Sequence, residues 1–151
     1  MDLASTEQSP KMTLLANYQV PRYLVDEALF HFDLDKSKTR VISTLKMRLN
    51  PESSAGECVL DGESLDLVSI KLNGKELEET DYQLSDKSLV ISEVPDKFEL
   101  EVITEIHPDQ NTALEGLYHS GRLLCTQCEA QGFRRITYYP DRPDVMSIFT
   151  V

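Results

Sequence analysis

Two thiols stand three residues apart in the stretch CTQCEAQGFR, residues 125–134, and a carboxylate directly follows the second. This is the spacing of a zinc clip or of a redox pair. Zinc sites need four ligands, normally in two pairs, whereas only Cys125 and Cys128 form a pair here and the three histidines stand singly. A redox pair opens a helix after a strand, and Glu129 would disfavour the thiolate. We predict structural cysteines, with zinc binding and redox chemistry as the alternatives.

The other polar groups of this stretch are Gln127 and Glu129, which alternate in the sequence. If the segment is extended, both side chains project to the same side. A carboxylate beside an amide carbonyl, presented on a loop by a rigid sheet, can receive an ammonium group. An ordinary solvent-exposed strand can also carry Gln and Glu, so the residues alone leave that alternative open.

Alternation of apolar and polar residues predicts the strands that hold this stretch. Residues 23–34 and 41–49 alternate, with one break at Asp26, and the turn DKSK between them predicts an antiparallel hairpin. A third strand runs into Asn73-Gly74, a strong hairpin signal. Short strands follow around 82–84 and 88–91, and a long one spans 98–106. The residues expected to face the core are Leu24, Ala28, Phe30, Phe32, Leu34, Val41, Leu45, Met47, Leu49, Val68, Ile70, Leu72, Phe98, Leu100, Val102 and Ile106.

No stretch shows sustained helical periodicity, so the expected fold class is all-β: an antiparallel β-sandwich or a saddle-like sheet with long structured loops. Residues 109–151 are rich in turn residues and predict two short strands and a helical turn near 141–146. Residues 1–17 are polar and unpatterned. They predict a flexible lead-in, and the ordered domain is expected to span residues 18–151.

Composition limits the partners. A chain of 151 residues is the size of one domain, and its net charge of −11 repels phosphate backbones, which argues against nucleic acid. The apolar runs are too short to cross a bilayer, and the N-terminus lacks the features of a signal peptide. Three cysteines, an odd number, are typical of a reducing compartment. We therefore expect a cytoplasmic protein without a membrane partner.

Four blocks in the second half of the chain resemble bacterial aminopeptidase N, a zinc metalloaminopeptidase of the gluzincin type. They are NTALEGLY (111–118), CTQCEAQGFR (125–134), ITYY (136–139) and DRPDV (141–145), in the same order as in that family. Weaker similarity extends through YLVDEALFHFDLDKSKTRV. The resemblance therefore covers nearly the whole chain beyond the lead-in.

The resemblance implies that residues 18–151 are the N-terminal β domain, incomplete at its C-terminal end, of a larger multidomain aminopeptidase. In that family the Gln-x-Glu loop, here Gln127 and Glu129, reaches the catalytic domain and binds the free α-amine of the peptide substrate. The family's HExxH zinc motif is absent from these 151 residues. Zinc is therefore expected in the full-length parent and not in this chain, which alone should be inactive. Gln131 stands where the family usually has Glu.

The implied partners are the N-terminus of a peptide substrate and the remaining domains of the same polypeptide. The alternative is a free-standing β-sandwich module that binds protein or carbohydrate through its acidic face. An HExxH motif further along the gene would favour the domain of a larger aminopeptidase. A stop codon after residue 151 would favour the free-standing module.

The other conspicuous residues favour structural roles. Asp141, Arg142 and Asp144 predict a turn with an internal salt bridge, Tyr138 and Tyr139 predict packing, and His31 is expected to be exposed. The loop at 111–118 is expected to support the Gln127–Glu129 segment, with direct substrate contact by Glu115 as the less favoured alternative.

Overall fold

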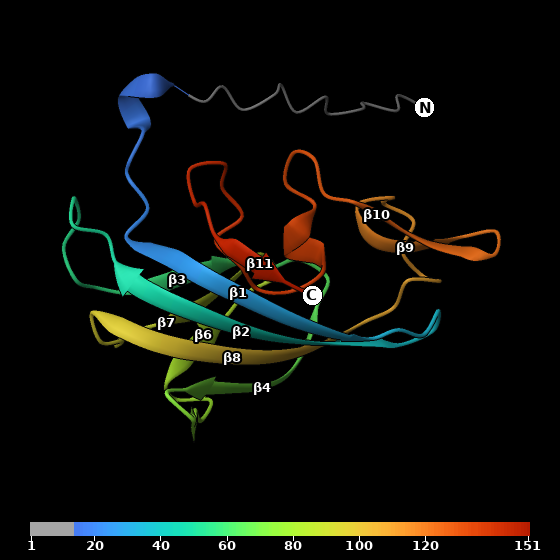
Figure 1. The fold of residues 1–151 in the computed structure, drawn as a ribbon, viewed down its shortest axis with the longest axis horizontal. Coiled ribbons are helices and arrows are strands. Elements are labelled where there is room, and N and C mark those ends of the chain that lie inside the picture. The colour runs from blue at the N-terminus through green and yellow to red at the C-terminus, as the bar shows by residue number, and fades with distance from the viewer. Residues whose placement is uncertain (1–13) are drawn as a thin grey trace, which may run out of the picture.

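A computed structural model describes residues 14–151, and its regular structure is almost entirely strand (Figure 1). Thirteen elements follow one another along this part of the chain. They are η1 (Leu15–Asn17), β1 (Tyr23–Asp33), β2 (Thr39–Leu49), β3 (Cys58–Asp61), β4 (Asp66–Leu72), β5 (Lys75–Glu76), β6 (Tyr82–Leu84), β7 (Ser88–Ile91), β8 (Lys97–Ile106), β9 (Gly116–Ser120), β10 (Leu123–Gln127), η2 (Phe133–Arg135) and β11 (Ile148–Thr150). The all-β prediction is confirmed.

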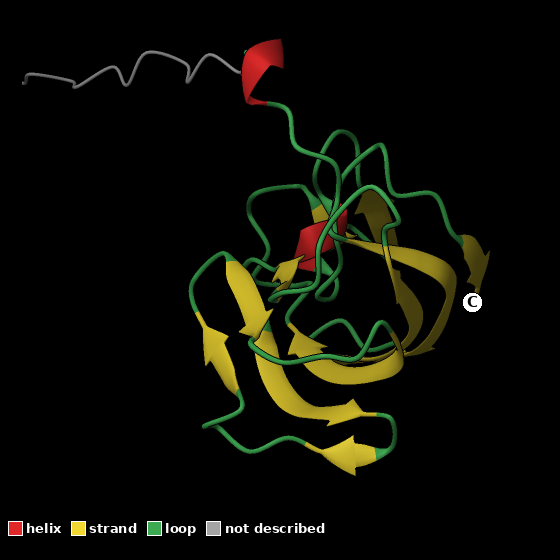
Figure 2. Cartoon of the chain, turned by 90° about the vertical axis from the view of Figure 1, so that its left-hand side faces the viewer, coloured by secondary structure: helices red, strands yellow, loops and turns green. Residues whose placement is uncertain are grey.

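The strands form three sheets. A six-stranded sheet has the order β11-β1-β2-β8-β4-β5, a three-stranded sheet has the order β3-β7-β6, and β9 pairs with β10 alone. Figure 1 shows β1, β2 and β8 side by side as one long layer, with the β9–β10 hairpin standing at one end, and Figure 2 shows that the long strands bend strongly. All pairings are antiparallel except that of β11 with β1.

The core lies between the six-stranded and three-stranded sheets. Alternate residues of β2 and β8 enter it from one side, and residues of β3 and β7 enter it from the other. The fully buried side chains include Val41, Leu45, Leu60, Leu89, Ile91, Leu100 and Val102. The alternation predicted for β2 and β8 is therefore confirmed, as is the hairpin of β1 with β2.

A β-bulge shifts the alternation within β1. The register slips between Val25 and Glu27, so Tyr23 and Val25 are buried before the bulge and Ala28 and Phe30 after it. The prediction that Leu24 faces the core was wrong, because the residue that breaks the pattern, Asp26, is an inserted residue that moves the preceding ones to the opposite phase. The predicted inward position of Leu34 was also wrong, since the strand ends at Asp33 and Leu34 is exposed.

A second bulge lies in β4, between Leu67 and Ser69. It leaves Val68 exposed, contrary to prediction, while Ile70 is buried as expected. The turn after β4 has the predicted conformation: Asn73 and Gly74 have φ of 50° and 80°, as a tight hairpin with both central residues left-handed requires.

The segment after β8 is tied to the body by a buried polar seam. The Thr137 hydroxyl donates to Ser43 Oγ at 3.2 Å, Ser43 donates to the Val102 carbonyl, and Thr104 donates to the Ile136 carbonyl at 3.3 Å. Each of these hydroxyls thus has an acceptor where the segment crosses the sheet. Directional contacts thus fix the place of residues 136–137 on the layer below.

The predicted helical turn lies elsewhere in the segment. Residues 142–145 form a simple turn, with the Val145 N–H donating to the Arg142 carbonyl at 3.2 Å, and the helical turn is η2 at Phe133–Arg135. Pro143 disfavours helical geometry at the residue before it, which accounts for the difference. Of the predicted lead-in at 1–17, residues 1–13 lie outside the described part of the chain, and Leu15–Asn17 form η1.

Candidate functional site

The β9–β10 hairpin carries the candidate residues to one end of the molecule. A two-residue turn joins its strands, and Gly121 adopts a left-handed φ of 64° there. The ladder ends where Gly116 pairs with Gln127. Gln127 is therefore the last residue that the sheet holds directly.

A turn follows the strand, so Glu129 does not continue the alternation that the sequence suggests. The Gly132 N–H donates to the Cys128 carbonyl at 2.9 Å, which closes residues 128–132 into a compact loop. The Gln127 side chain donates from Nε2 to the Glu129 carbonyl at 3.3 Å. Both Gln127 and Glu129 are exposed. The loop thus offers the Glu129 carboxylate to solvent while the Gln127 amide braces its backbone.

Two glycines allow the ends of this loop to come together. A Cβ atom on Gly132 would lie 2.4 Å from the Gln127 carbonyl oxygen and 3.0 Å from the Cys128 Cα. Gly116 has a left-handed φ of 72°, and its own Cβ would approach the Gly132 carbonyl to 3.2 Å. Close backbone approach of this kind requires glycine.

η2 packs the C-terminal end of the loop, after Gly132, against the core. The Phe133 ring meets the rings of Phe30 and Tyr139 edge to face, at centroid distances of 5.5 and 5.1 Å, and it also contacts Phe149. The Arg134 side chain donates from Nε to the Asp141 carboxylate at 3.0 Å. Aromatic and ionic contacts together fix the residues that follow Gly132.

Arg135 joins the end of the loop to the strand that faces its start, and Asn111 braces that strand. Arg135 forms ion pairs with Glu63 at 2.6 Å and Glu115 at 3.2 Å. The Asn111 side-chain amide donates to the backbone carbonyls of Glu115 and Leu117 at 2.7 and 2.9 Å. The segment at 111–118 therefore braces the start of β9, the strand that pairs with β10 just before the loop. Sequence reasoning did not single out Arg135, because no periodic pattern marks a residue that joins three distant segments.

Two of the three cysteines, Cys58 and Cys128, pack in or against the apolar core. Cys58 is buried, which raises its pKa to about 12, and burial also raises the pKa of Cys128, with a further contribution from Asp141. A raised pKa reduces the thiolate that redox chemistry needs. Among residues 14–151, no group of three His, Cys, Asp or Glu side chains is placed to hold a metal.

The remaining predicted residues have the structural contacts expected of them. Arg142 pairs with Asp144 at 2.7 Å, and this hydrogen-bonded contact lowers the pKa of the Asp144 carboxyl. Tyr138 and Tyr139 are buried, and His31 is exposed. These placements confirm the structural interpretation of each.

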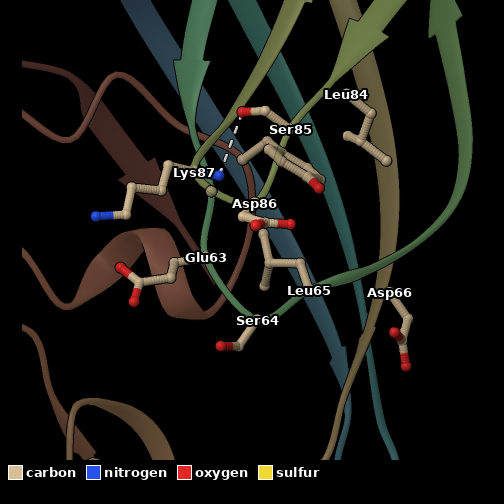
Figure 3. A pocket seen from close by; sticks show the side chains of 10 residues that line it. Glu63, Ser64, Leu65, Asp66, Leu84, Ser85, Asp86 and Lys87 are labelled. Atoms are coloured by element: carbon tan, nitrogen blue, oxygen red, sulfur yellow. Dashed lines mark hydrogen bonds between the residues drawn. The ribbon is translucent and has the colours of Figure 1, made fainter.

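A cavity of about 510 Å³ lies between the segment at 62–66 and the turn at 84–87 (Figure 3). Figure 3 shows Glu63, Asp66 and Asp86 around it. Glu63 is paired with Arg135, and Asp66 accepts a contact from the His107 ring at 3.0 Å. Because the fold already uses two of the three carboxylates, the cavity is a less suitable receptor for a cation than the Glu129 loop.

Comparison with known proteins identifies relatives of the whole described region. The family described as Peptidase M1 N-terminal domain matches residues 16–151. The chain is 45% identical to aminopeptidase N of Escherichia coli K12 and 43% identical to aminopeptidase N of Caulobacter vibrioides, in both cases over 95% of this chain and 16% of the relative. The expected similarity to bacterial aminopeptidase N is confirmed. The chain spans 16% of the length of these curated relatives.

Solved structures with a similar fold also belong to aminopeptidases and zinc metallopeptidases. Legionella pneumophila aminopeptidase A, crystallised with aspartic acid, superposes with a TM-score of 0.83 at 32% identity, over 89% of this chain and 16% of that one. An M1 zinc metallopeptidase from Deinococcus radiodurans gives a TM-score of 0.70 at 16% identity, over 84% of this chain and 31% of that one. The second likeness shows a shared fold.

Proposed function

Because this chain belongs to the family of peptidase M1 N-terminal domains, we propose that it is the recognition module of a zinc aminopeptidase that removes N-terminal amino acids from peptides. In this proposal the Gln127–Glu129 loop anchors the free α-amine of the substrate. Catalysis belongs to the polypeptide that completes the enzyme, and the isolated chain is inactive.

One observation carries the proposal: an exposed carboxylate stands on a loop whose two ends are fixed. Glu129 follows the last ladder residue of β10, and the Phe133 ring and the Arg134 and Arg135 ion pairs hold the other end. A carboxylate held in this way can pair with an ammonium ion at a defined distance. An aminopeptidase needs such a fixed contact, because it must distinguish a free N-terminus and set the first peptide bond over the metal.

The zinc of the enzyme is assigned to residues outside this chain. The described residues offer no three-ligand group that fits a metal, and the cysteine pair has only two thiols. The contribution of this chain is therefore binding and orientation. Its partners are the peptide N-terminus and the other parts of the same polypeptide.

We also assign the module to a reducing, cytoplasmic compartment. The chain has three cysteines, and an odd number is typical of a reducing compartment. Within residues 14–151 no helix is long and apolar enough to cross a membrane.

Replacement of Glu129 in the full-length enzyme tests the proposal. In the proposed complex the catalytic part of the enzyme covers the pair of Glu129 with the substrate ammonium. Loss of one member of a buried, hydrogen-bonded charge pair costs roughly 2–5 kcal/mol, so Glu129→Ala should lower kcat/KM about 30-fold to several thousand-fold. Turnover of an amino-acid anilide is the measurement. Wild-type turnover by this variant would disprove the assignment.

Gln127→Ala provides the graded comparison. A neutral hydrogen bond contributes about 0.5–1.5 kcal/mol, so its loss should lower kcat/KM only about 2- to 13-fold. A larger effect from Gln127 than from Glu129 would assign the amine contact to the amide instead of the carboxylate.

A further inference from the structure

Arg135 has two acidic partners that come from widely separated parts of the chain. Its Nε donates to Glu115 Oε2 at 3.2 Å, and its second terminal nitrogen donates to Glu63 Oε1 at 2.6 Å. The remaining terminal nitrogen contacts Ser64 Oγ at 3.4 Å. The Arg135 side chain is only 18% exposed, whereas its partners Glu63 and Glu115 are 34% and 52% exposed, so water reaches both pairs from the carboxylate side.

The pair with Glu115 closes the base of the Glu129 loop. Glu115 directly precedes Gly116, which is the ladder partner of Gln127 at the start of the loop. Arg135 lies three residues after Gly132, where the loop ends, and the Gly132 carbonyl accepts the Arg135 N–H at 3.1 Å. One ion pair therefore joins the strand that carries the first end of the loop to the helical turn that carries the second.

The pair with Glu63 fixes this closed base to the body. Glu63 follows β3, and Figure 3 shows it beside Ser64 in the segment that leads to β4. The Glu63 N–H also donates to the Arg134 carbonyl at 2.9 Å, so two contacts join this segment to η2. The planar guanidinium holds each of its contacts in a set direction, which a point charge on a flexible chain does not.

We propose that Arg135 is a positioning residue for amine recognition: through Glu115 and Glu63 it sets where the Glu129 carboxylate stands relative to the substrate ammonium. The proposal rests on the function proposed above and adds a residue that does not touch the substrate. Arg135 acts only through Glu129. Its removal should therefore matter only while Glu129 is present.

A double-mutant cycle in the full-length enzyme tests this dependence. A shift of about 1 Å in a positioned group can cost about 100-fold, so Arg135→Gln should lower kcat/KM about 10- to 100-fold. In the Glu129→Ala background the same substitution should change kcat/KM less than about 2-fold, because the two residues form one unit. Arg135→Lys keeps the charge but loses the planar fork, and it should give an intermediate loss.

Two further variants separate positioning from folding. Arg40 on β2 also donates two guanidinium hydrogen bonds to a glutamate, Glu105, but lies on the sheet face, so Arg40→Gln should leave kcat/KM unchanged. If Arg135→Gln prevents folding, Glu115→Gln takes its place in the cycle, because Glu115 is half exposed and its loss removes only the pair that closes the loop. Thermal unfolding of each variant checks that the domain is folded.

The outcomes distinguish the two proposals. A loss that disappears in the Glu129→Ala background supports the positioning role. Equal losses in both backgrounds, or no loss from Arg135→Gln in the wild-type background, overturn it while amine anchoring by Glu129 stands. Wild-type kcat/KM for Glu129→Ala overturns amine anchoring, and the positioning role with it.

Discussion

Two regions of the molecule share one apolar core but differ in how their backbone is held in place. Residues 23–106 form long strands whose alternate side chains fill one core, with Leu45, Leu100 and Val102 completely buried. Residues 107–151 contain three short strands, and long-range side-chain contacts fix much of the rest. Arg134 pairs with Asp61, Arg135 pairs with Glu63, and Arg142 donates to the Gln19 carbonyl. The Phe133 ring meets the Phe30 ring of β1 edge to face.

This difference shows how the fold separates stability from recognition. Burial of apolar area is non-directional, so the body gains free energy without holding any one atom in a narrow position. Guanidinium contacts and close glycine packing contribute less free energy, but they define positions. Binding residues are often found on loops that a rigid scaffold positions in this way.

The largest stability effect should come from the body. Leu100→Ala removes a fully buried side chain from the centre of the sheet and should lower the free energy of unfolding by about 2–5 kcal/mol. Chemical denaturation of the 151-residue chain measures it. Leu29→Ala on β1 is the matched control, because Leu29 is half exposed and its loss should cost within about 0.5 kcal/mol. Similar losses at both positions would contradict the placement of the core.

A smaller stability effect, with a larger consequence for recognition, should come from the loop. In Gly132→Ala the new methyl group meets backbone atoms of Gln127 and Cys128, which should cost about 1–3 kcal/mol and displace Glu129. Turnover by the full-length enzyme should fall together with the thermal midpoint. The control is Gly121→Ala in the hairpin turn, where the added methyl meets no atom within 4 Å and only the left-handed φ is strained. This control should leave turnover unchanged. Equal turnover by the two variants would show that the conformation of the loop does not affect substrate recognition.

The smallest effect should depend on pH and lies at the junction of the two regions. The His107 ring contacts the Ser37 carbonyl at 2.7 Å and the Asp66 carboxylate at 3.0 Å. Both partners are acceptors, so both contacts form only when the ring is protonated. The Ser37 carbonyl first, then Asp66 and Asp109, raise the pKa of His107 above its ordinary 6.5, while partial burial opposes them.

The sign of this pH effect follows from the raised pKa. The stabilisation is complete below pH 6.5 and is lost as pH rises through the higher pKa of the folded state. It should amount to less than about 1 kcal/mol, because water screens the pair. Denaturation of wild type and His107→Gln at several pH values measures it. The two curves should converge at alkaline pH, and a gap that widens there would contradict the assignment.

The alternation of apolar and polar residues predicted correctly which side chains face the core where the strands are regular. It failed where a strand contains an inserted residue. Val41, Leu45 and Met47 on β2 are buried as predicted. Leu24 and Val68 are not: the bulge at Asp26 changes the phase of the residues before it, and Val68 is itself the inserted residue of the bulge in β4. A bulge depends on how two strands pair. The alternation within one strand shows where the pattern is interrupted, but not whether the residues before or after the interruption face the core.

Sequence reasoning found the candidate residues but not the contacts that support them. Gln127 and Glu129 were singled out by residue type and by family resemblance, and the structure adds that a turn begins after Gln127. Arg135 joins segments 72 residues apart when it pairs with Glu63. Nothing local in the sequence marks such a pair. The signals within reach were Gly116 and Gly132, which bracket the loop and indicate close backbone approach.

The bulge in β1 has a consequence for the other end of the chain. The Val25 carbonyl, at the register slip, accepts a hydrogen bond from Ser147 Oγ at 2.9 Å, and β11 then pairs with β1 from Glu27 onward. The bulge in β1 is thus the attachment point of a segment 122 residues further along the chain. Deletion of Asp26 would make the alternation of buried and exposed residues in β1 regular. It would also remove the bulge at which the Val25 carbonyl accepts the Ser147 hydrogen bond that positions β11.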